Sequence, residues 1–403
     1  MKLRLMAMMM LLAAGAASLS GCAARAARCT GDTDTPQHHY LAGMKALESG
    51  DTAAAQKKLE RSLYCNEEFA PGHSGMAIVH AEKAKVQTDA AFRQAEAARS
   101  GESLKRGRSF ADTPADYFEY HLAGIRSLNA MKPKGWLDDA DGHFRDAVSL
   151  RVADRDLPYY QGIEAAQYFM GSALLEGYEF GRSREMFAAV LNAKRDGKWH
   201  ELADVSWRRA NRIEQALAGM TVGDAGKRIA VKDSVSRADL AALLIDQLKI
   251  GSLMAGRLGD PAAEAHLAEF VPADVVAHPY RQEVLTLMKW RIRGIEPRYD
   301  ETTKAYLFMP DEAVSRGELA LVLEDVLLRI VGNEKLATAY YSQDNSPFSD
   351  VRSSSPLFNA VTIMTARGIM SGDLQGRFHP NRPVSGADAL LAVRTLQQKL
   401  NFN

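Results

Sequence analysis

The first half of the chain has the apolar spacing of α-helices and little of the alternation that is typical of strands. From about residue 37 to residue 200, apolar positions recur at intervals of three and four, and Ala, Leu, Glu, Lys, Gln and Arg dominate. These residue types favour helices, and this period places apolar side chains along one helix face. The pattern therefore predicts a run of amphipathic helices over residues 37–200.

Small and apolar residues also recur at intervals of four and then three, in four places. The four sets are Ala55, Leu59 and Ser62; Ala91, Ala95 and Ala98; Ala140, Phe144 and Ala147; and Ser183, Phe187 and Val190. Gly43, Gly124 and Gly171 precede three of these sets, and a residue without a side chain lets a partner helix approach closely. Repeats of about 34 residues indicate stacked helix pairs.

The segment that begins at His38, HHYLAGMKALESGDTAAAQKKLERSLYCNEEFAPGHSGMA, resembles the tetratricopeptide repeat. Gly43 lies where the first helix meets its partner, and Gly50-Asp51 forms the turn between the two helices. The resemblance implies an array over residues 37–200 whose concave face holds a protein partner. A helical spacer without a dedicated partner is the alternative.

A ten-residue phrase occurs three times in the second half of the chain. Its copies are VSRADLAALL from Val235, VSRGELALVL from Val314 and VSGADALLAV from Val384. In each copy a serine precedes an apolar helical run, and an acid follows three positions later: Ser236 with Asp239, Ser315 with Glu318, and Ser385 with Asp388. This spacing is typical of a capping box, so each copy is predicted to begin a helix.

Further sequence similarity lies upstream of the second and third copies. FVPADVVAHPY from Phe270 and FSDVRSSSPLF from Phe348 lead into helical runs that end at Gly-Ile pairs, residues 294–295 and 368–369, before Phe-x-Pro at 308–310 and 378–380. Glycine at these helix ends suits the left-handed conformation. Asp274 and Asp350, in the two upstream segments, are interpreted as caps at the start of the first helix of each copy. The first copy has weaker counterparts, LADVSWRRA from Leu202 and GMTVGDAGKRIAVKD from Gly219.

This order of elements resembles the S-layer homology (SLH) domain, most closely in the third copy. The resemblance implies three helical SLH modules, at about residues 201–250, 268–330 and 346–402, in a pseudo-threefold arrangement that buries their apolar faces together. The predicted fold class is therefore mostly α, with a tetratricopeptide-like array over residues 37–200 followed by three modules over residues 201–403.

Arg237 and Arg316 occupy the first helical position after the capping serine, where the third copy has Gly386. A cation at a helix N-terminus is unfavourable by about 0.3–1 kcal/mol, so capping does not explain these arginines. Arginine beside free backbone amides is a good receptor for carboxylate or phosphate. The SLH resemblance implies that they bind an acidic or pyruvylated sugar of a cell-wall polymer. Pairing with neighbouring acids, or simple solvation, is the alternative.

The N-terminus has the layout of a secretory signal, with Lys2 and Arg4 before an apolar stretch that is too short to span a membrane comfortably. The segment LSGC, ending at Cys22, resembles the bacterial lipobox. This implies a signal peptide over residues 1–21 and acylation of Cys22 by fatty acids such as palmitate. An ordinary secretion signal with a chance cysteine is the alternative. Ala23 resembles the residue that directs lipoproteins to the outer membrane, and residues 22–36 are predicted to be a tether.

Cys29 and Cys65 are the remaining cysteines, in a compartment that permits disulfides. Their separation in sequence does not fix their distance, so a Cys29–Cys65 bridge and two free thiols both stay open.

Charge and motifs exclude several classes of function. Lys and Arg number 50, as do Asp and Glu, so the net charge is zero and nucleic acid is not an expected partner. GDAGKR, from Gly223, lacks the first glycine and the final Ser or Thr of a phosphate loop and is interpreted as a turn. His38 and His39 have no partner ligands at metal-binding spacing. No catalytic motif is found, and neither an enzyme nor a cofactor is predicted.

These expectations describe an outer-membrane lipoprotein that faces the periplasm. It is predicted to bind peptidoglycan or wall-linked acidic polysaccharide through its SLH modules, and a protein partner through its helical repeats. The alternative is a tetratricopeptide-type assembly scaffold whose SLH modules are purely structural.

Overall fold

The computed structural model describes residues 29–401 apart from residues 30, 194, 219–222 and 259–269. These residues are mainly helical, which confirms the predicted class. The predicted signal peptide and its acylated Cys22 lie outside the described residues. The chain divides into two compact units, residues 1–166 and residues 167–403.

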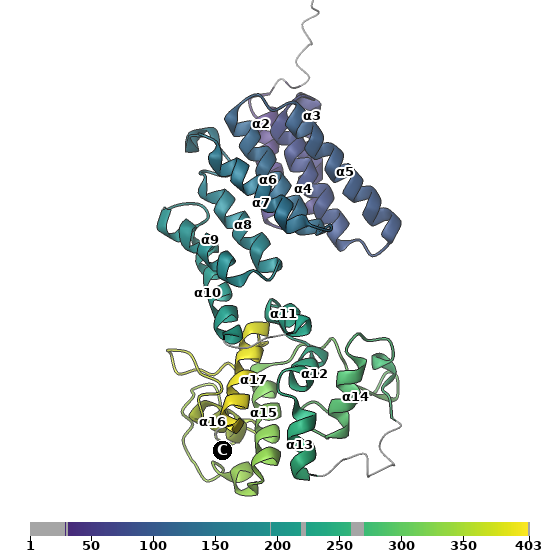
Figure 1. Cartoon of the computed structure of the whole chain (residues 1–403), viewed down its shortest axis with the longest axis vertical. Coiled ribbons are helices and arrows are strands. Elements are labelled where there is room, and N and C mark those ends of the chain that lie inside the picture. The colour runs from purple at the N-terminus through teal and green to yellow at the C-terminus, as the bar shows by residue number, and fades with distance from the viewer. Residues whose placement is uncertain (1–28, 30, 194, 219–222, 259–269, 402–403) are drawn as a thin grey trace, which may run out of the picture. The chain divides into compact units, whose positions relative to one another are not determined.

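The described part of the first unit contains three antiparallel helix pairs. They are α2 (Pro36–Glu48) with α3 (Thr52–Cys65), α4 (Ala70–Val86) with α5 (Ala90–Ser109), and α6 (Pro114–Met131) with α7 (Trp136–Ser149). The members of each pair pack on each other, and α4 also packs on α2 and α6 (Figure 1). The unit is therefore a stack of helical hairpins.

Glycine allows the close approach that was predicted in the first and third pairs. A Cβ added to Gly43 would lie 2.7 Å from Cγ of Leu59, which is fully buried between the pairs. A Cβ added to Gly124 would lie 2.6 Å from Cε1 of His143. At both positions any side chain would push the two helices apart.

The predicted packing positions of the second pair are wrong. Ala91, Ala95 and Ala98 are exposed, because α5 turns a different face toward α4. Ser100 is buried there and donates a hydrogen bond to the carbonyl oxygen of Ala77 at 2.8 Å, and Gly107 lies against Ser74. An alanine-rich helix has no strong apolar stripe, so the spacing of its alanines does not determine its packing face.

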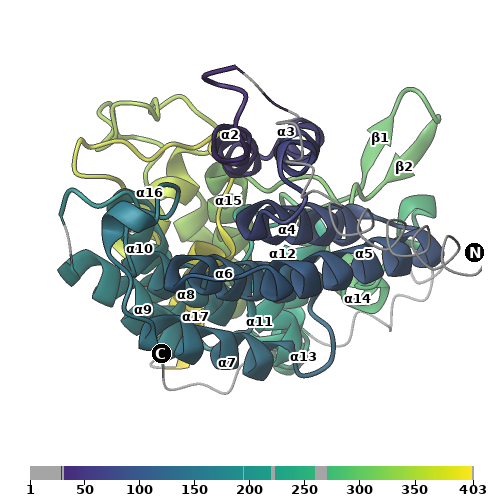
Figure 2. The ribbon, with the colours of Figure 1, turned by 90° about the horizontal axis from the view of Figure 1, so that it is seen from above.

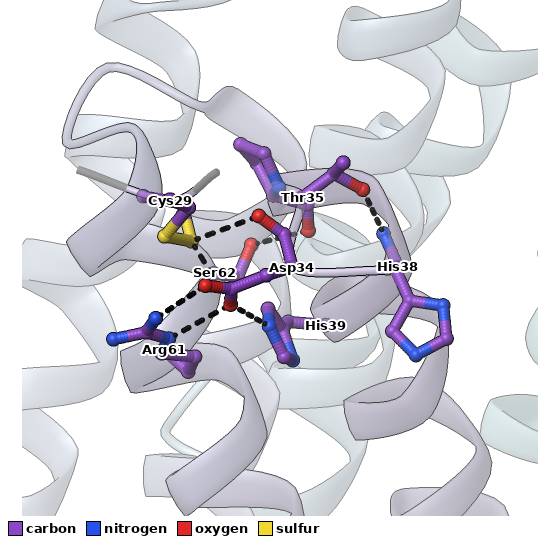
Figure 3. The surroundings of a disulfide bond; sticks show 9 residues. Cys29, Asp34, Thr35, His38, His39, Arg61 and Ser62 are labelled. Carbon is purple, nitrogen blue, oxygen red and sulfur yellow. Dashed lines mark hydrogen bonds and ion pairs between the residues drawn. A yellow bond between two sulfur atoms is a disulfide. The ribbon is translucent and has the colours of Figure 1, made fainter. Parts of the chain in front are cut away.

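Cys29 and Cys65 form a disulfide that ties the start of the described chain to the end of α3. Asp34 lies beside the bridge and accepts hydrogen bonds from Arg61 and His39, which lower its pKa to about 2 (Figure 3). The cluster holds Cys29 and Asp34 against the first helix pair. The disulfide leaves neither sulfur as a thiolate that could bind a metal.

The second unit continues with helices, two short strands and short 3-10 turns. They are α8 (Glu164–Glu176, which begins in the first unit), α9 (Phe180–Ala193), α10 (His200–Leu217), α11 (Asp224–Ala230), α12 (Arg237–Asp246), α13 (Ile250–Leu258), α14 (Arg281–Lys289), β1 (Arg298–Asp300), β2 (Ala305–Leu307), α15 (Arg316–Val331), α16 (Phe358–Ala366) and α17 (Gly386–Asn401). Because α9 packs on α10, the last predicted hairpin belongs to the second unit. The boundary between the units therefore falls at residue 166, whereas the sequence placed it at residue 200.

Three sequence repeats build the rest of this unit. The first repeat is residues 200–246 (α10 to α12), the second is residues 270–331 (α14, the β1–β2 hairpin and α15), and the third is residues 347–401 (α16 and α17). The last helix of each repeat packs on the first helix of the next: α12 on α14, α15 on α16, and α17 back on α10. The helix packing thus closes a ring of three repeats.

The backbone closes the same ring at the repeated valine. The amide of Val314 donates to Val235 O at 2.9 Å, that of Val384 to Val314 O at 3.0 Å, and that of Val235 to Val384 O at 3.0 Å. All three valines are buried. The serine after each valine caps its helix as predicted, with the amide three residues later donating to Ser236, Ser315 or Ser385. The repeated phrase therefore supplies both a helix start and the closure of the ring.

Candidate functional site

The junction between the first and second repeats is sealed by Arg237. Its guanidinium donates to the carbonyl oxygens of Phe308, at 2.8 Å, and Glu296, at 2.7 Å, and it lies over the Phe308 ring. The residue is only 2% exposed. The Nε and NH2 groups of Arg237 therefore both donate to backbone carbonyl oxygens of the next repeat. This corrects its predicted role: a buried guanidinium that spans two repeats holds them together and offers no surface to a glycan.

The junction between the second and third repeats uses Arg316 in the same way but leaves it accessible. Its Nε donates to Phe378 O at 2.9 Å, its NH2 group donates to Ser371 O at 2.6 Å, and it lies over the Phe378 ring. Arg316 is half-buried and lines a cavity of about 180 Å³ between α15, α17 and the Gly-Ile turn of the third repeat. Of the two predicted arginines, Arg316 is the more exposed, and it borders this cavity.

The junction that closes the ring, from the third repeat back to the first, has a different design. Phe308 and Phe378 stand seven positions before the capping serine, and Ile229 holds that position in the first repeat. Ile229 lies in α11, which corrects the prediction of a turn at GDAGKR. Its carbonyl oxygen would lie 1.7 Å from a Cβ on Gly386. The third repeat lacks the arginine because the helix of the first repeat fills the place of a side chain.

Asp274 and Asp350 position the backbone segments whose carbonyl oxygens the arginines bind. Asp350 accepts hydrogen bonds from the amides of Phe378 and His379 at 2.8 and 2.7 Å, and Asp274 does the same for Phe308 and Met309. His379 and Met309 have left-handed backbones, which turn successive amides toward one anion. The sequence suggested that the two carboxylates cap helix starts. The structure shows that they bind backbone amides of the Phe-x-Pro segments. They fix the Phe-x-Pro segment on which each arginine lies.

Charged side chains of the first and third repeats lie near Arg316. Asp388 lines it and pairs with Arg212 of α10, at 3.0 Å, from the first repeat. Burial lowers the pKa of Arg316. Asp388 opposes this shift, and the charges of Arg382 and Arg212 add to it. Arg212 and Arg382 were missed because they lie far from the repeated phrase, and only the closed ring brings them to it.

Such a cavity can bind an anion. The three guanidinium groups of Arg316, Arg382 and Arg212 outnumber the carboxylates of Asp388 and Asp350, and Arg316 and Arg382 are accessible to solvent. A planar guanidinium forms paired hydrogen bonds with a carboxylate or phosphate. Residues 368–371 also line the cavity.

A comparison with known protein families matches the segment that forms one wall of this cavity. Residues 347–390 match the S-layer homology domain. The match covers the third repeat from before α16 to the first turns of α17, and it supports cell-wall polymer binding and a location in the cell envelope. The chain matches no curated protein and no solved structure. Among the described residues, no helix is both long enough and apolar enough to span a membrane.

Proposed function

We propose that the protein binds an anionic cell-wall polymer in the cavity between the second and third repeats. The observation that carries this proposal is the position of Arg316, which lines that cavity with the charges of Arg382 and Arg212 close by. An acidic or pyruvylated sugar would bind these guanidinium groups, and the neighbouring SLH domain belongs to a class that binds wall polymers. The proposed activity is binding, not catalysis.

We also propose that the first and second repeats are divergent SLH modules. The cyclic valine hydrogen bonds and the cyclic helix packing support this, because each repeat contributes the same two contacts to the ring. The second repeat also keeps the aspartate and Phe-x-Pro elements of the third. The first repeat departs from the pattern, because Asp204 pairs with Arg208 within α10 instead of binding backbone amides.

The direct test is co-sedimentation of the purified full-length protein with isolated cell-wall sacculi. Arg316→Ala is expected to weaken binding about tenfold or more, which corresponds to about 1.4 kcal/mol. Arg382→Ala, a surface change, is expected to weaken it several-fold with unchanged thermal stability. Arg237→Ala is the matched control, because it removes the equivalent backbone contacts at a junction where the arginine is buried. Sedimentation of folded Arg316→Ala and Arg382→Ala proteins at the wild-type level would overturn the proposal.

Treating the sacculi with hydrofluoric acid separates the two predicted polymers. The acid removes polysaccharides that are attached through phosphodiesters and leaves the peptidoglycan. Loss of binding would assign the ligand to the attached acidic polysaccharide, and retained binding would assign it to peptidoglycan. Added salt should weaken the interaction in either case, because exposed charges are screened beyond about 10 Å at 0.1 M ionic strength.

A lipid anchor at Cys22 is part of the same proposal and rests on the LSGC segment. Two or more acyl chains give stable membrane attachment, whereas one alone is marginal. Mass spectrometry of the mature protein would detect the acyl chains on Cys22, and Cys22→Ser should leave an unacylated protein. An unmodified Cys22 in the mature wild-type protein would remove the anchor from the proposal.

The second candidate function is an assembly scaffold formed by the first unit. A cavity of about 430 Å³ lies at the N-terminal ends of α2, α4 and α6, and Tyr40, Phe69, Pro71 and Asp116 are among its lining residues. Its charged lining is mostly acidic, which favours a partner segment that carries a basic side chain. Capture of a partner protein that Asp116→Lys abolishes, with no sedimentation on sacculi, would favour this function over the first.

A further inference from the structure

The second repeat carries a β-hairpin that the third repeat lacks. Fourteen positions separate Gly294 from Phe308, whereas ten separate Gly368 from Phe378. The additional residues form the antiparallel strands β1 and β2, which stand clear of the neighbouring helices α12 and α14 (Figure 2). The third repeat closes the same connection with a tight turn around Gly376. Closure of the ring therefore does not require the hairpin.

The two faces of the hairpin differ in their chemistry. The register pairs Arg298 with Leu307 and Tyr299 with Tyr306, so the arginine and the tyrosines point to opposite faces. Arg298 donates to Glu312 at 2.9 Å and to Glu318 at 2.9 Å, which fixes its face against the second repeat. The tyrosine face consequently turns away from the protein.

Tyr299 and Tyr306 form an exposed aromatic pair on that outer face. Their ring centroids are 5.3 Å apart in an edge-to-face arrangement, and the residues are 47% and 56% exposed. A cross-strand aromatic pair stabilises a hairpin by only about 0.2–1 kcal/mol. Two adjacent phenol rings of this exposure combine a broad apolar surface with hydroxyl groups that can form hydrogen bonds, as at binding interfaces.

The charged groups of the hairpin all have local hydrogen-bond or ion-pair partners. Arg298 is paired with two glutamates, Lys304 donates to Glu301 at 2.8 Å, and Asp300 accepts from both the amide and the hydroxyl of Thr303. The outer face presents aromatic surface and phenol hydroxyls, while the charged side chains bond to one another, to Thr303 or to the second repeat. Such a face suits a ligand that carries both C–H surfaces and hydroxyls.

We propose that Tyr299 and Tyr306 form a binding platform for uncharged sugar units of a glycan chain. The axial C–H face of a pyranose ring packs on an aromatic ring, while its hydroxyls bond the phenol oxygens. The inference deepens the proposed function, because it assumes that the wall polymer is a glycan. It adds a charge-independent contact at the second repeat, separate from the cavity at Arg316.

The test uses the full-length protein and chitotetraose, an uncharged tetramer of N-acetylglucosamine, in calorimetric titrations. Tyr299→Ala with Tyr306→Ala is expected to weaken binding about tenfold, since aromatic contacts dominate the energy of such sites. Tyr299→Phe with Tyr306→Phe keeps the rings and should lose at most a few-fold. Tyr341→Ala, which changes a 62% exposed tyrosine elsewhere in the unit, is the matched control and should have no effect. If the double alanine variant loses its fold, the single change Tyr306→Leu, which keeps apolar bulk without a ring, replaces it.

The outcomes separate this inference from the proposed function. Arg316→Ala should bind chitotetraose normally, and added salt should not change that binding. Wild-type titration without binding, or equal binding by wild type and the tyrosine variants, would overturn the platform even if Arg316 binds the anionic polymer. Analytical ultracentrifugation adds a further check: if the wild type is a dimer and the double alanine variant a monomer, the rings are a self-association surface and the inference is wrong.

Discussion

The carbonyl oxygen of Ile229 lies so close to Gly386 that a Cβ on that glycine would be 1.7 Å away. The amide of Gly386 also donates to Lys232 O at 2.9 Å, so backbone meets backbone where the third repeat joins the first. The other two junctions place an arginine at this position. The ring therefore closes by two different contacts, a guanidinium bound to a Phe-x-Pro segment and a glycine packed on the end of a helix.

Gly386→Ala is expected to destabilise the second unit strongly. A methyl group would overlap the Ile229 carbonyl, and overpacking of this kind costs about 1–3 kcal/mol or more when backbone must move. Chemical denaturation followed by helical circular dichroism measures the loss. Gly251→Ala is the matched control, because nothing lies within 4 Å of a Cβ at that helical position. Equal stability of the two variants would contradict the close packing at Gly386.

Arg237→Ala is expected to lower the stability of the second unit by about 2–4 kcal/mol, because hydrogen bonds from a charged group are lost and carbonyl oxygens are left buried without donors. Arg237→Lys should restore little, since one ammonium cannot replace the fork of donors that reaches two separate carbonyls. The exposed Arg352→Ala serves as the control. Denaturation midpoints of the three variants check the ranking, and a stable Arg237→Ala protein would argue against a structural role.

Asp350 should contribute stability that is lost in acid. Burial raises its pKa, but the hydrogen bonds from the Phe378 and His379 amides outweigh burial, and the net pKa lies below the ordinary 3.8. A depressed pKa means that the stabilisation is complete above about pH 4 and disappears as the pH falls through the folded-state value. Asp350→Asn is therefore expected to be less stable at pH 7, by about 1–2 kcal/mol, and to approach the wild type in acid. Exposed Asp246→Asn should follow the wild-type curve throughout.

Much of the ring could be predicted from local sequence rules. The capping serines, the acids three residues later and the left-handed Gly294 and Gly368 follow from short-range backbone geometry, and the structure has them as predicted. The role of the arginines could not be derived in this way. Arg237 and Arg316 occupy the same position after a capping serine, and only the neighbouring repeat determines which of them stays accessible to solvent.

The same limit explains the errors in the first unit and at the closing junction. Ala91, Ala95 and Ala98 have the expected spacing but little apolar bulk, so the spacing alone did not determine which face of α5 is buried. The glycine-containing sequence at residues 224–230 resembles a turn. Packing of Ile229 and Ala230 in the core nevertheless stabilises a helix there. Tertiary packing overrides weak local preference in both places.

The Cys29–Cys65 disulfide should stabilise the first unit by about 2–4 kcal/mol, the typical contribution of a native disulfide. Cys65→Ser, or reduction of the wild type, is expected to lower the denaturation midpoint of the helical stack by that amount. The reductant should have no further effect on Cys65→Ser, which is the internal control. A wild-type midpoint that is unchanged after complete reduction would show that the cluster around Asp34 holds the segment without the bond.

A buried histidine pair should make the first unit sensitive to mild acid. Nδ1 of His121 lies 3.0 Å from Nδ1 of His143, so one ring donates to the other and both cannot carry a proton on these atoms. Burial and then the charge of His143 lower the pKa of His121 to about 4. Burial also lowers the pKa of His143, although the carboxylates of Asp146 and Asp139 act to raise it. The pair is consequently neutral at pH 7, although Asp146 lies close enough to favour the charged form.

This depression fixes the direction of the pH effect. The unfolded chain takes up protons on both histidines near pH 6.5, whereas folded His121 resists protonation until about pH 4 and the pKa of folded His143 is also lowered. Stability is therefore complete above pH 6.5 and falls as the pH drops below it. The slope is at most about 1.4 kcal/mol per pH unit for each histidine. Amide hydrogen exchange of α6 and α7 between pH 7 and pH 5 measures it locally, after correction for intrinsic rates. His121→Gln should flatten the slope, whereas exposed His38→Gln should not, and equal slopes in both variants would assign the acid sensitivity to other groups.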